Sequence, residues 1–274
     1  MQTLARSTRR EARGRRPDAG AGLASCALLL AVILLSACSA STRPVVKIGL
    51  VAPFEGRFRT IGYEAIYAAR LAVREINAAG GVNGYRVELT ALDDRGEPER
   101  AIEAAQQLLL DRQVAVVIGH FRPDSSDAAK QTYCEAGLPV IIVESAARSC
   151  ESAFVLGRAP RDRWPDDQLI FVSNVPDPNG LSAARDFVET YNALPIDGTR
   201  AGPIALQTYE ALYLVVEAIA QAQTIDRAGV QAALRQIDFT GLGAQYAFDQ
   251  QGDLINRQTY VFEYDKDRQP QLIP

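Results

Sequence analysis

Several polar side chains stand directly after apolar segments that have the composition of buried strands. In an open parallel sheet, ligands bind beyond the carboxyl ends of the strands. Ser125 and Ser126 begin a predicted helix, and the free N–H groups of a helix start can hold a carboxylate. Together these groups suit a small polar solute. The candidate ligand-binding residues are Phe54, Glu55, His120, Phe121, Arg122, Ser125, Ser126, Ser145, Ala146 and Ala147.

Two of these assignments have a structural alternative. Ser125 could serve only as the N-cap of its helix. Arg122 and Glu144 could form a new polar site or could simply pair at the surface, and we favour the surface pair.

The sequence argues against an enzyme. His120 is the only histidine, and no Gly-x-Ser-x-Gly elbow accompanies it. Cys134 lies late in a predicted helix, where a thiol is not activated. Metal-ligand clusters, a P-loop and a Gly-x-Gly-x-x-Gly motif are absent from the sequence. We expect neither a catalytic residue, nor a cofactor, nor a metal site.

The N-terminus has the pattern of an export signal. Residues 1–22 carry six arginines against two acids, a net charge of +4, and residues 23–37 carry no charge. A basic segment before a short apolar one is typical of a secretory signal peptide. Leu35-Ser36-Ala37-Cys38 matches a bacterial lipobox, so we expect cleavage after 37, lipidation of Cys38 and a short tether at 38–44. An ordinary cleaved signal or an uncleaved anchor is the alternative.

These features predict a lipoprotein in the cell envelope that faces the periplasm or the exterior. The whole chain has a net charge of −4, so the part after the +4 segment carries −8. An acidic protein lacks the basic footprint that nucleic acid requires. We therefore expect no nucleic-acid partner.

Two cysteines remain after the predicted signal and anchor. Cys134 and Cys150 could pair in an oxidising compartment. The predicted elements place them toward opposite ends of a strand, and a bridge requires Cα atoms within about 7 Å. The sequence leaves the disulfide open.

Strands and helices alternate through the first half of the chain. The strands are short apolar runs, and the helices show apolar residues at helical spacing. This βαβ alternation predicts a parallel sheet covered on both faces. The predicted strands are 45–51, 85–92, 114–119 and 138–143, and the predicted helices are 62–80, 99–110 and 125–136.

The pattern breaks between Ala147 and Asp167, where prolines and charges gather. A strand at 169–174 comes next, and then helices at 181–191, 203–223 and 226–237, the last capped by Asp226. The C-terminus predicts a hairpin of 244–248 with 259–264 around a turn at 249–253.

Several segments together resemble the branched-chain amino-acid-binding proteins of ABC transporters. Ile-Asn-Ala-Ala-Gly-Gly-Val-Asn-Gly at 76–84 is similar to a family segment, and Asp-Asp-Arg-Gly-Glu-Pro at 93–98 comes after it in the family's order. Segments 117–120, 238–241 and 248–253 continue the likeness over nearly the whole chain after the signal. The resemblance implies a type 1 periplasmic binding protein with two α/β lobes that close on a ligand.

The chain departs from that family in its middle. The family builds most of its second lobe where this sequence has only some twenty residues, and a lobe needs about 100. We therefore expect an α/β, three-layer parallel-sheet lobe with the second lobe truncated. The expected lobe comprises 45–158 and 169–240, and 241–274 is expected to be a C-terminal β-hairpin left from the second lobe.

The resemblance implies a small polar solute such as an amino acid, and an ABC permease as partner. Pro123 and Ala147 fall where the family has ligand-binding hydroxyls, so the family's own site is incomplete here. The alternative is a single-lobe interaction or sensor module that docks on another envelope protein or forms a homodimer through its exposed face.

Overall fold

The computed structural model describes residues 43–147, 150–159, 169–196, 200–255 and 257–273. The expected signal peptide 1–37, Cys38 and most of the tether 38–44 lie outside the described residues. The described residues from Arg43 onward belong to one compact unit.

Among the described residues, five parallel strands form the central sheet, in the order β2-β1-β3-β4-β5. Every residue of β3 and β4 is buried, because helices cover both faces of the sheet. The strands are β1 (Val45–Ala52), β2 (Arg86–Asp93), β3 (Val114–Ile118), β4 (Val140–Ser145) and β5 (Ala153–Arg158).

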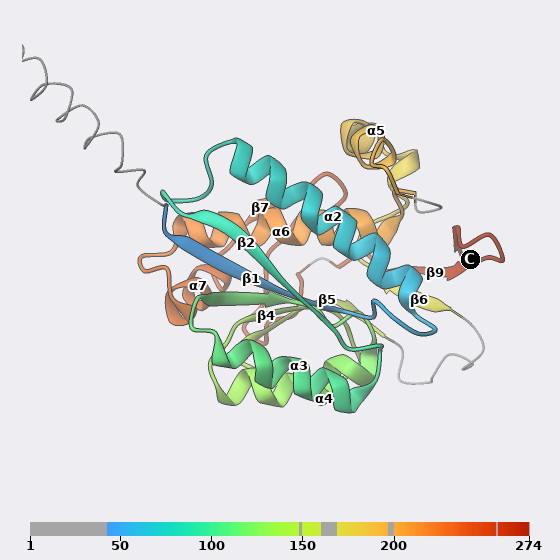
Figure 1. Ribbon diagram of the computed structural model, residues 1–274. Coiled ribbons are helices and arrows are strands. Elements are labelled where there is room, and N and C mark those ends of the chain that lie inside the picture. The colour runs from blue at the N-terminus through green and yellow to red at the C-terminus, as the bar shows by residue number, and fades with distance from the viewer. Residues whose placement is uncertain (1–42, 148–149, 160–168, 197–199, 256, 274) are drawn as a thin grey trace, which may run out of the picture. The chain divides into compact units, whose positions relative to one another are not determined.

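Helices lie on both sides of this sheet (Figure 1). One apolar cluster joins alternate strand residues such as Ile48 and Ile141 to α2 (Arg59–Ala78), α6 (Pro203–Gln221) and α7 (Arg227–Leu234). The other cluster joins the opposite strand residues to α3 (Pro98–Leu110) and α4 (Pro123–Glu135). The predicted three-layer parallel-sheet fold is confirmed.

Helix boundaries agree with the local chemistry of the sequence. Asp226 caps α7, since its carboxylate accepts a hydrogen bond from the N–H of Gly229 at 2.8 Å. Within the described part of the chain, no helix is both long and apolar enough to cross a membrane.

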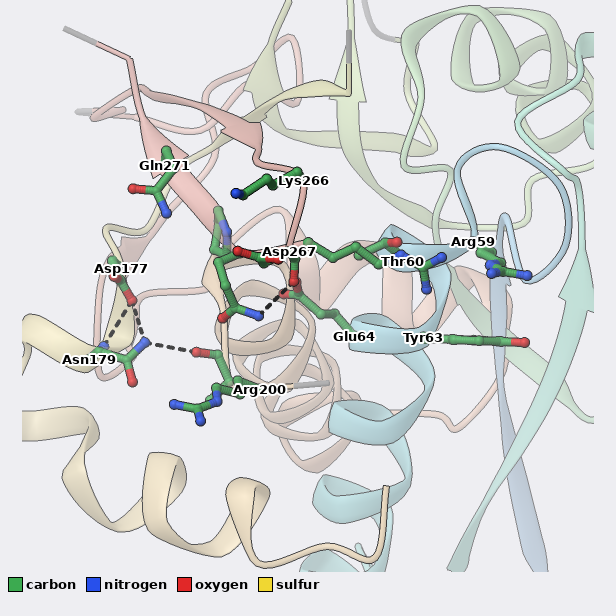
Figure 2. A pocket seen from close by; sticks show the side chains of 14 residues that line it. Arg59, Thr60, Tyr63, Glu64, Asp177, Asn179, Arg200, Lys266, Asp267 and Gln271 are labelled. Atoms are coloured by element: carbon green, nitrogen blue, oxygen red, sulfur yellow. Dashed lines mark hydrogen bonds between the residues drawn. The ribbon is translucent and has the colours of Figure 1, made fainter. Parts of the chain in front are cut away.

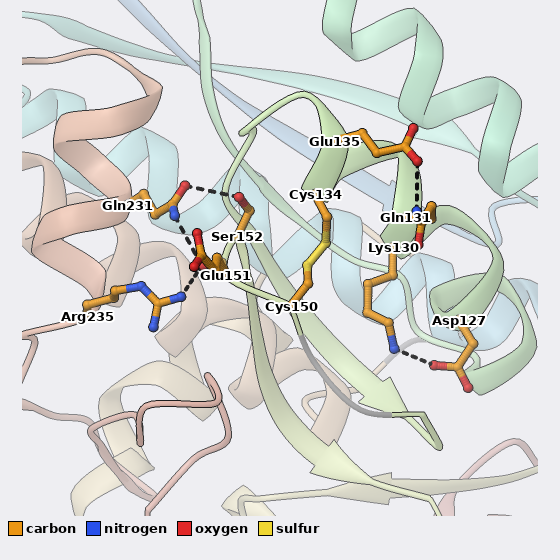
Figure 3. The surroundings of a disulfide bond; sticks show 10 residues. All are labelled: Asp127, Lys130, Gln131, Cys134, Glu135, Cys150, Glu151, Ser152, Gln231 and Arg235. Carbon is orange, nitrogen blue, oxygen red and sulfur yellow. Dashed lines mark hydrogen bonds and ion pairs between the residues drawn. A yellow bond between two sulfur atoms is a disulfide. The ribbon is translucent and has the colours of Figure 1, made fainter.

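Strand β5 lies where the sequence predicted only a break. Ala153–Arg158 pairs with β4 in parallel register, Ile141 opposite Phe154. Cys150 precedes β5 and so lies at the amino-terminal edge of the sheet, the edge at which α4 ends. Cys134 and Cys150 are joined by a disulfide with a Cα–Cα distance of 6.3 Å (Figure 3). The expected separation of the two cysteines was wrong because the extra strand was missed.

The C-terminal strands pair differently from the predicted hairpin. β8 (Gln245–Tyr246) pairs with β7 (Phe239–Thr240) and not with β9 (Tyr260–Tyr264). β9 instead lies between β6 (Ile170–Ser173) and β10 (Pro270–Leu272) in an antiparallel sheet. Phe171 and Phe262 stack across the β6–β9 pair with ring centroids 5.5 Å apart, and cross-strand aromatic pairs of this kind stabilise a sheet.

The remaining helix and turns lie beside α2 and α6. α5 (Arg185–Asn192) packs its Phe187 and Tyr191 against them. Two short 3₁₀ turns precede it, η1 (Pro178–Gly180) and η2 (Ser182–Ala184).

Candidate functional site

At the carboxyl edge of the sheet, Asp93 holds the loop after β1. The backbone N–H of Phe54 donates to its Oδ1 at 2.7 Å, and so does that of Arg95 at 3.0 Å. Glu55 pairs with Arg95 at 2.7 Å, but both side chains are exposed, so this ion pair contributes little stability. Phe54 and Glu55 are therefore fixed against the end of β2.

The single histidine is completely buried. His120 Nδ1 lies 2.6 Å from Asp94 Oδ2, and Nε2 lies 3.1 Å from the hydroxyl of Tyr133. Burial raises the pKa of Tyr133 well above its ordinary value, so this hydroxyl stays protonated. The hydrogen-bond chain ties the β2–α3 loop to α4, and a solute cannot reach His120 in this structure.

Arg122 and Glu144 do not form the surface pair that we favoured. Arg122 lies over the ring of Phe58, 4.3 Å from its centroid, and donates to the backbone carbonyl of Ile170 at 2.7 Å. Glu144 is 1% exposed, and neither carboxylate oxygen has a hydrogen bond of good geometry. Burial raises the pKa of Glu144 to about 7, although the charge of Arg122 and the N–H of Val172 act in the opposite direction.

The two serines have different surroundings. α4 begins at Pro123, so Ser125 lies inside the helix and is not its N-cap. Its buried hydroxyl has no partner among the described residues. Ser126 donates to the carbonyl of His120 at 3.2 Å, and Phe121 is buried in the core.

The carboxylate of Asp127 on α4 lies against the end of β4 and the loop after it, whereas we expected a solute carboxylate at the N–H groups of the helix start. The hydroxyl of Ser145 donates to Oδ1 at 2.5 Å, and the N–H groups of Ala146 and Ala147 donate to Oδ2 at 3.3 and 3.1 Å. Lys130, which is 8% exposed, lies 3.2 Å from the same carboxylate (Figure 3). The last residue of β4, the loop after it and the middle of α4 therefore form a nest of four donors around one carboxylate.

Sequence reasoning identified three of these donors but not the group that they bind. Ser145, Ala146 and Ala147 were predicted as ligand-binding residues from their place after a strand, whereas Asp127 and Lys130 were read only as helix residues. Their spacing of three places both side chains on one face of α4, which could have shown that they act together. The structure brings together His120, Ser126 and the Asp127 nest, and it leaves Phe54 and Glu55 at the Asp93 loop.

Comparison with known proteins agrees with the fold. A family model described as periplasmic binding protein matches residues 45–158 and 165–269. An amino acid binding protein of Pseudomonas aeruginosa is 32% identical over 191 residues, which are 68% of this chain and 51% of that protein. A Leu/Ile/Val-binding protein of Escherichia coli is 28% identical over 121 residues, 44% of this chain and 33% of that protein.

Solved structures show the same architecture at low identity. A branched-chain amino acid transporter substrate binding protein of Streptococcus pneumoniae, in complex with isoleucine, aligns with a TM-score of 0.66 at 14% identity, over 84% of this chain and 99% of that chain. An ABC transporter substrate-binding protein of Desulfitobacterium hafniense, in complex with leucine, gives 0.66 at 18%, over 84% of this chain and 100% of that one.

The chain spans about half the length of the curated relative from Pseudomonas aeruginosa and a smaller share of the others.

Proposed function

Because this chain belongs to the periplasmic binding protein family, we propose that it is a lipid-anchored solute-binding protein of an ABC uptake system. Its ligand is a small polar solute with a carboxylate, in the first place an amino acid, as in the relatives that resemble it. The lipobox at 35–38 supports anchoring through acylated Cys38, and a cognate permease is the partner that receives the solute.

The observation that carries this proposal is the donor nest around Asp127. One hydroxyl, two backbone N–H groups and a largely buried ammonium converge on a carboxylate at the edge of the sheet where α/β proteins bind ligands. Charge-assisted hydrogen bonds to a carboxylate are about twice as strong as neutral ones. The nest therefore has the chemistry to recognise a solute carboxylate.

In the structure, the carboxylate of Asp127 fills that nest. A solute carboxylate must displace it, and the apparent affinity falls by the fraction of molecules in which the nest is open. The wild-type protein is therefore expected to bind its solute weakly. Removal of the Asp127 carboxylate leaves Lys130 without its ion-pair partner. The unpaired, largely buried ammonium then favours the binding of an anion.

We expect Asp127→Ala to bind the preferred amino acid about tenfold more tightly than wild type, a change of about 1.4 kcal/mol. The measurement is calorimetric titration of both purified proteins against a panel of amino acids. Glu135→Ala is the matched control, since it removes an exposed carboxylate from the other end of α4, where Glu135 accepts from Gln131. Flat titrations for wild type and Asp127→Ala alike would contradict solute binding at this nest.

The alternative expected from the sequence, an interaction module or homodimer, is not favoured by the described part of the surface. The large hydrophobic side chains exposed in the described residues lie on separate elements: Tyr63, Leu110, Leu242, Ile255 and Leu272. Light scattering over a range of concentrations tests the homodimer directly, and a constant monomer mass would count against it.

A further inference from the structure

A larger and a smaller cavity lie outside the Asp127 nest and share no residue with it. The larger has a volume of about 720 Å³, and charged side chains surround Glu64 in it, with Lys266 and Arg200 at opposite ends (Figure 2). The buried carboxyl of Glu64 already accepts from the hydroxyl of Tyr264 at 2.7 Å and from the N–H of Ala205 at 3.3 Å. Glu64 therefore has partners within the protein and needs none from a ligand.

The smaller cavity, which we call the Asn174 cavity, has a volume of about 360 Å³. This volume falls in the range of small-molecule sites, about 300 to 1,000 Å³. The cavity lies between the end of β6, the β7–β8 hairpin and the segment that follows β8. Its lining consists of Asn174, Asp238, Gly243, Ala244, Gln245, Ala247, Leu254, Ile255 and Gln258.

Asn174 brings an unsatisfied donor to the buried end of this cavity. The residue is 2% exposed, and its Oδ1 accepts from Nε2 of Gln207 at 2.5 Å, but its Nδ2 has no hydrogen bond of good geometry. The hydroxyl oxygen of Tyr246 lies near this amide. A carboxamide has two N–H groups, so at least one of them is free. A buried donor without an acceptor destabilises a protein, and an acceptor on a ligand removes that penalty.

The acceptors near this buried end already have donors. Oδ1 of Asn174 accepts from Gln207, and the backbone carbonyls of Ala244 and Ala247 each accept from a backbone N–H at 2.8 Å. A ligand N–H placed there would lose its water without gaining a comparable partner. The buried end therefore suits a group that accepts a hydrogen bond and does not donate one.

The lining also favours an uncharged ligand. No arginine, lysine or histidine is among the described lining residues, so a carboxylate would find no cation there. The one acid of this lining, Asp238, is exposed and accepts from Gln245 at 2.9 Å. A ligand cation would meet it only at the solvent-exposed rim, where an ion pair contributes little. Aliphatic side chains such as those of Ala247 and Leu254 supply walls for a hydrocarbon body.

We propose that the Asn174 cavity is a second binding site, for a small neutral carbonyl compound that accepts hydrogen bonds without donating them, a ketone or a lactone. The carbonyl oxygen accepts from Nδ2 of Asn174, and the hydrocarbon body lies against Ala247 and Leu254. One polar anchor is enough for this arrangement. The site is separate from the proposed amino-acid nest, because such a compound has no carboxylate and the two sites share no residue.

The direct test is nitrogen-15 NMR of the side-chain amide of Asn174 during titration of the purified protein with cyclopentanone. We expect a saturable downfield shift of an Asn174 side-chain amide proton. Two ligands of similar size serve as comparisons: 2-pyrrolidinone replaces a ring methylene with an N–H, and butyrate carries a negative charge. Both are expected to bind about tenfold more weakly or worse, because each brings a group that the buried end leaves unpaired. Absence of a saturable shift means that the cavity holds only water and overturns the proposal, and so does equal affinity for 2-pyrrolidinone or butyrate.

Ala247→Leu tests the place of the site without touching its polar anchor. The larger side chain fills the cavity from its wall, so cyclopentanone is expected to bind about tenfold more weakly or not at all. Ala232→Leu is the matched control, since it adds the same atoms at an exposed position of α7 outside the lining. Equal affinities in the two variants would place the ligand elsewhere and overturn the proposal.

The double variant Asn174→Leu/Gln207→Met tests the anchor itself. It replaces both amides of the buried pair with apolar side chains of similar shape, a change that costs little stability because no partner is left unpaired. Binding, followed through the backbone amide of Leu254, is expected to weaken about tenfold for cyclopentanone. If the double variant keeps the wild-type affinity, Asn174 is not the anchor and the proposal fails.

Discussion

Glu144→Gln is expected to stabilise the protein by about 3 kcal/mol at pH 8 and to flatten the pH dependence of its unfolding free energy. In the folded state the pKa of Glu144 is about 7, against an ordinary value of 4.5, because the buried carboxyl has lost its water. The folded state therefore binds an extra proton between these two values. Its stabilising contribution is complete below pH 4.5 and is lost as pH rises through about 7.

The measurement is urea unfolding of wild type and Glu144→Gln across that pH range. Glutamine has no proton to lose and keeps the shape of the protonated acid, so the two curves should converge at low pH and separate at high pH. The pKa of Glu64 is also raised, to about 8, so this residue makes the free energy of unfolding fall with rising pH in both proteins. Parallel curves for the two proteins would show that Glu144 titrates as an exposed acid.

Loss of the disulfide is expected to lower the free energy of unfolding by about 3 kcal/mol. Cys134 and Cys150 are 16 residues apart in sequence, so their bond removes loop freedom mainly from the unfolded chain. The disulfide ties the end of α4 to the start of β5, the strand at the edge of the parallel sheet (Figure 3).

The comparison is between wild type and the double variant Cys134→Ser/Cys150→Ser, each unfolded with and without a reductant. Reductant should destabilise wild type to about the level of the double variant and leave the double variant unchanged. If reductant leaves the free energy of unfolding of wild type unchanged, the disulfide between Cys134 and Cys150 is contradicted.

Much of the fold can be predicted from local sequence patterns. Strands β1 to β4 are apolar runs bounded by turn residues, and α2, α3 and α6 repeat apolar residues at helical spacing, so both kinds of element were predicted. β5 was missed because Ala153-Phe154-Val155-Leu156 is short and lies beside a segment rich in proline and charge. Prolines mark loops and turns, and here they belong to the segment after β5 and not to the strand itself.

The pairing of the C-terminal strands depends on tertiary contacts. β8 and β9 are separated by a turn that suits a hairpin, yet β9 lies against β6 from a distant part of the chain. The stacked rings of Phe171 and Phe262 belong to residues 91 positions apart, and a local pattern does not carry that information.

The sequence predicted where the candidate site lies, but not which groups its donors bind. The carboxyl ends of parallel strands meet at one edge, so the loop at 145–147 could be placed there from the sequence. The packing of α4 and β6 against the sheet decides that the carboxylate of Asp127 accepts from this loop. It also decides that Glu144 is buried within the electrostatic influence of Arg122.

The central claim is that the donors around Asp127 receive the carboxylate of a solute. It is tested most directly by nitrogen-15 NMR of the backbone amides of Ala146 and Ala147 in Asp127→Ala, titrated with the amino acid that binds best. We predict saturable downfield shifts of both amide protons in Asp127→Ala, and smaller shifts of the same two protons in wild type. Amides that stay unmoved while the amino acid binds elsewhere would contradict the claim.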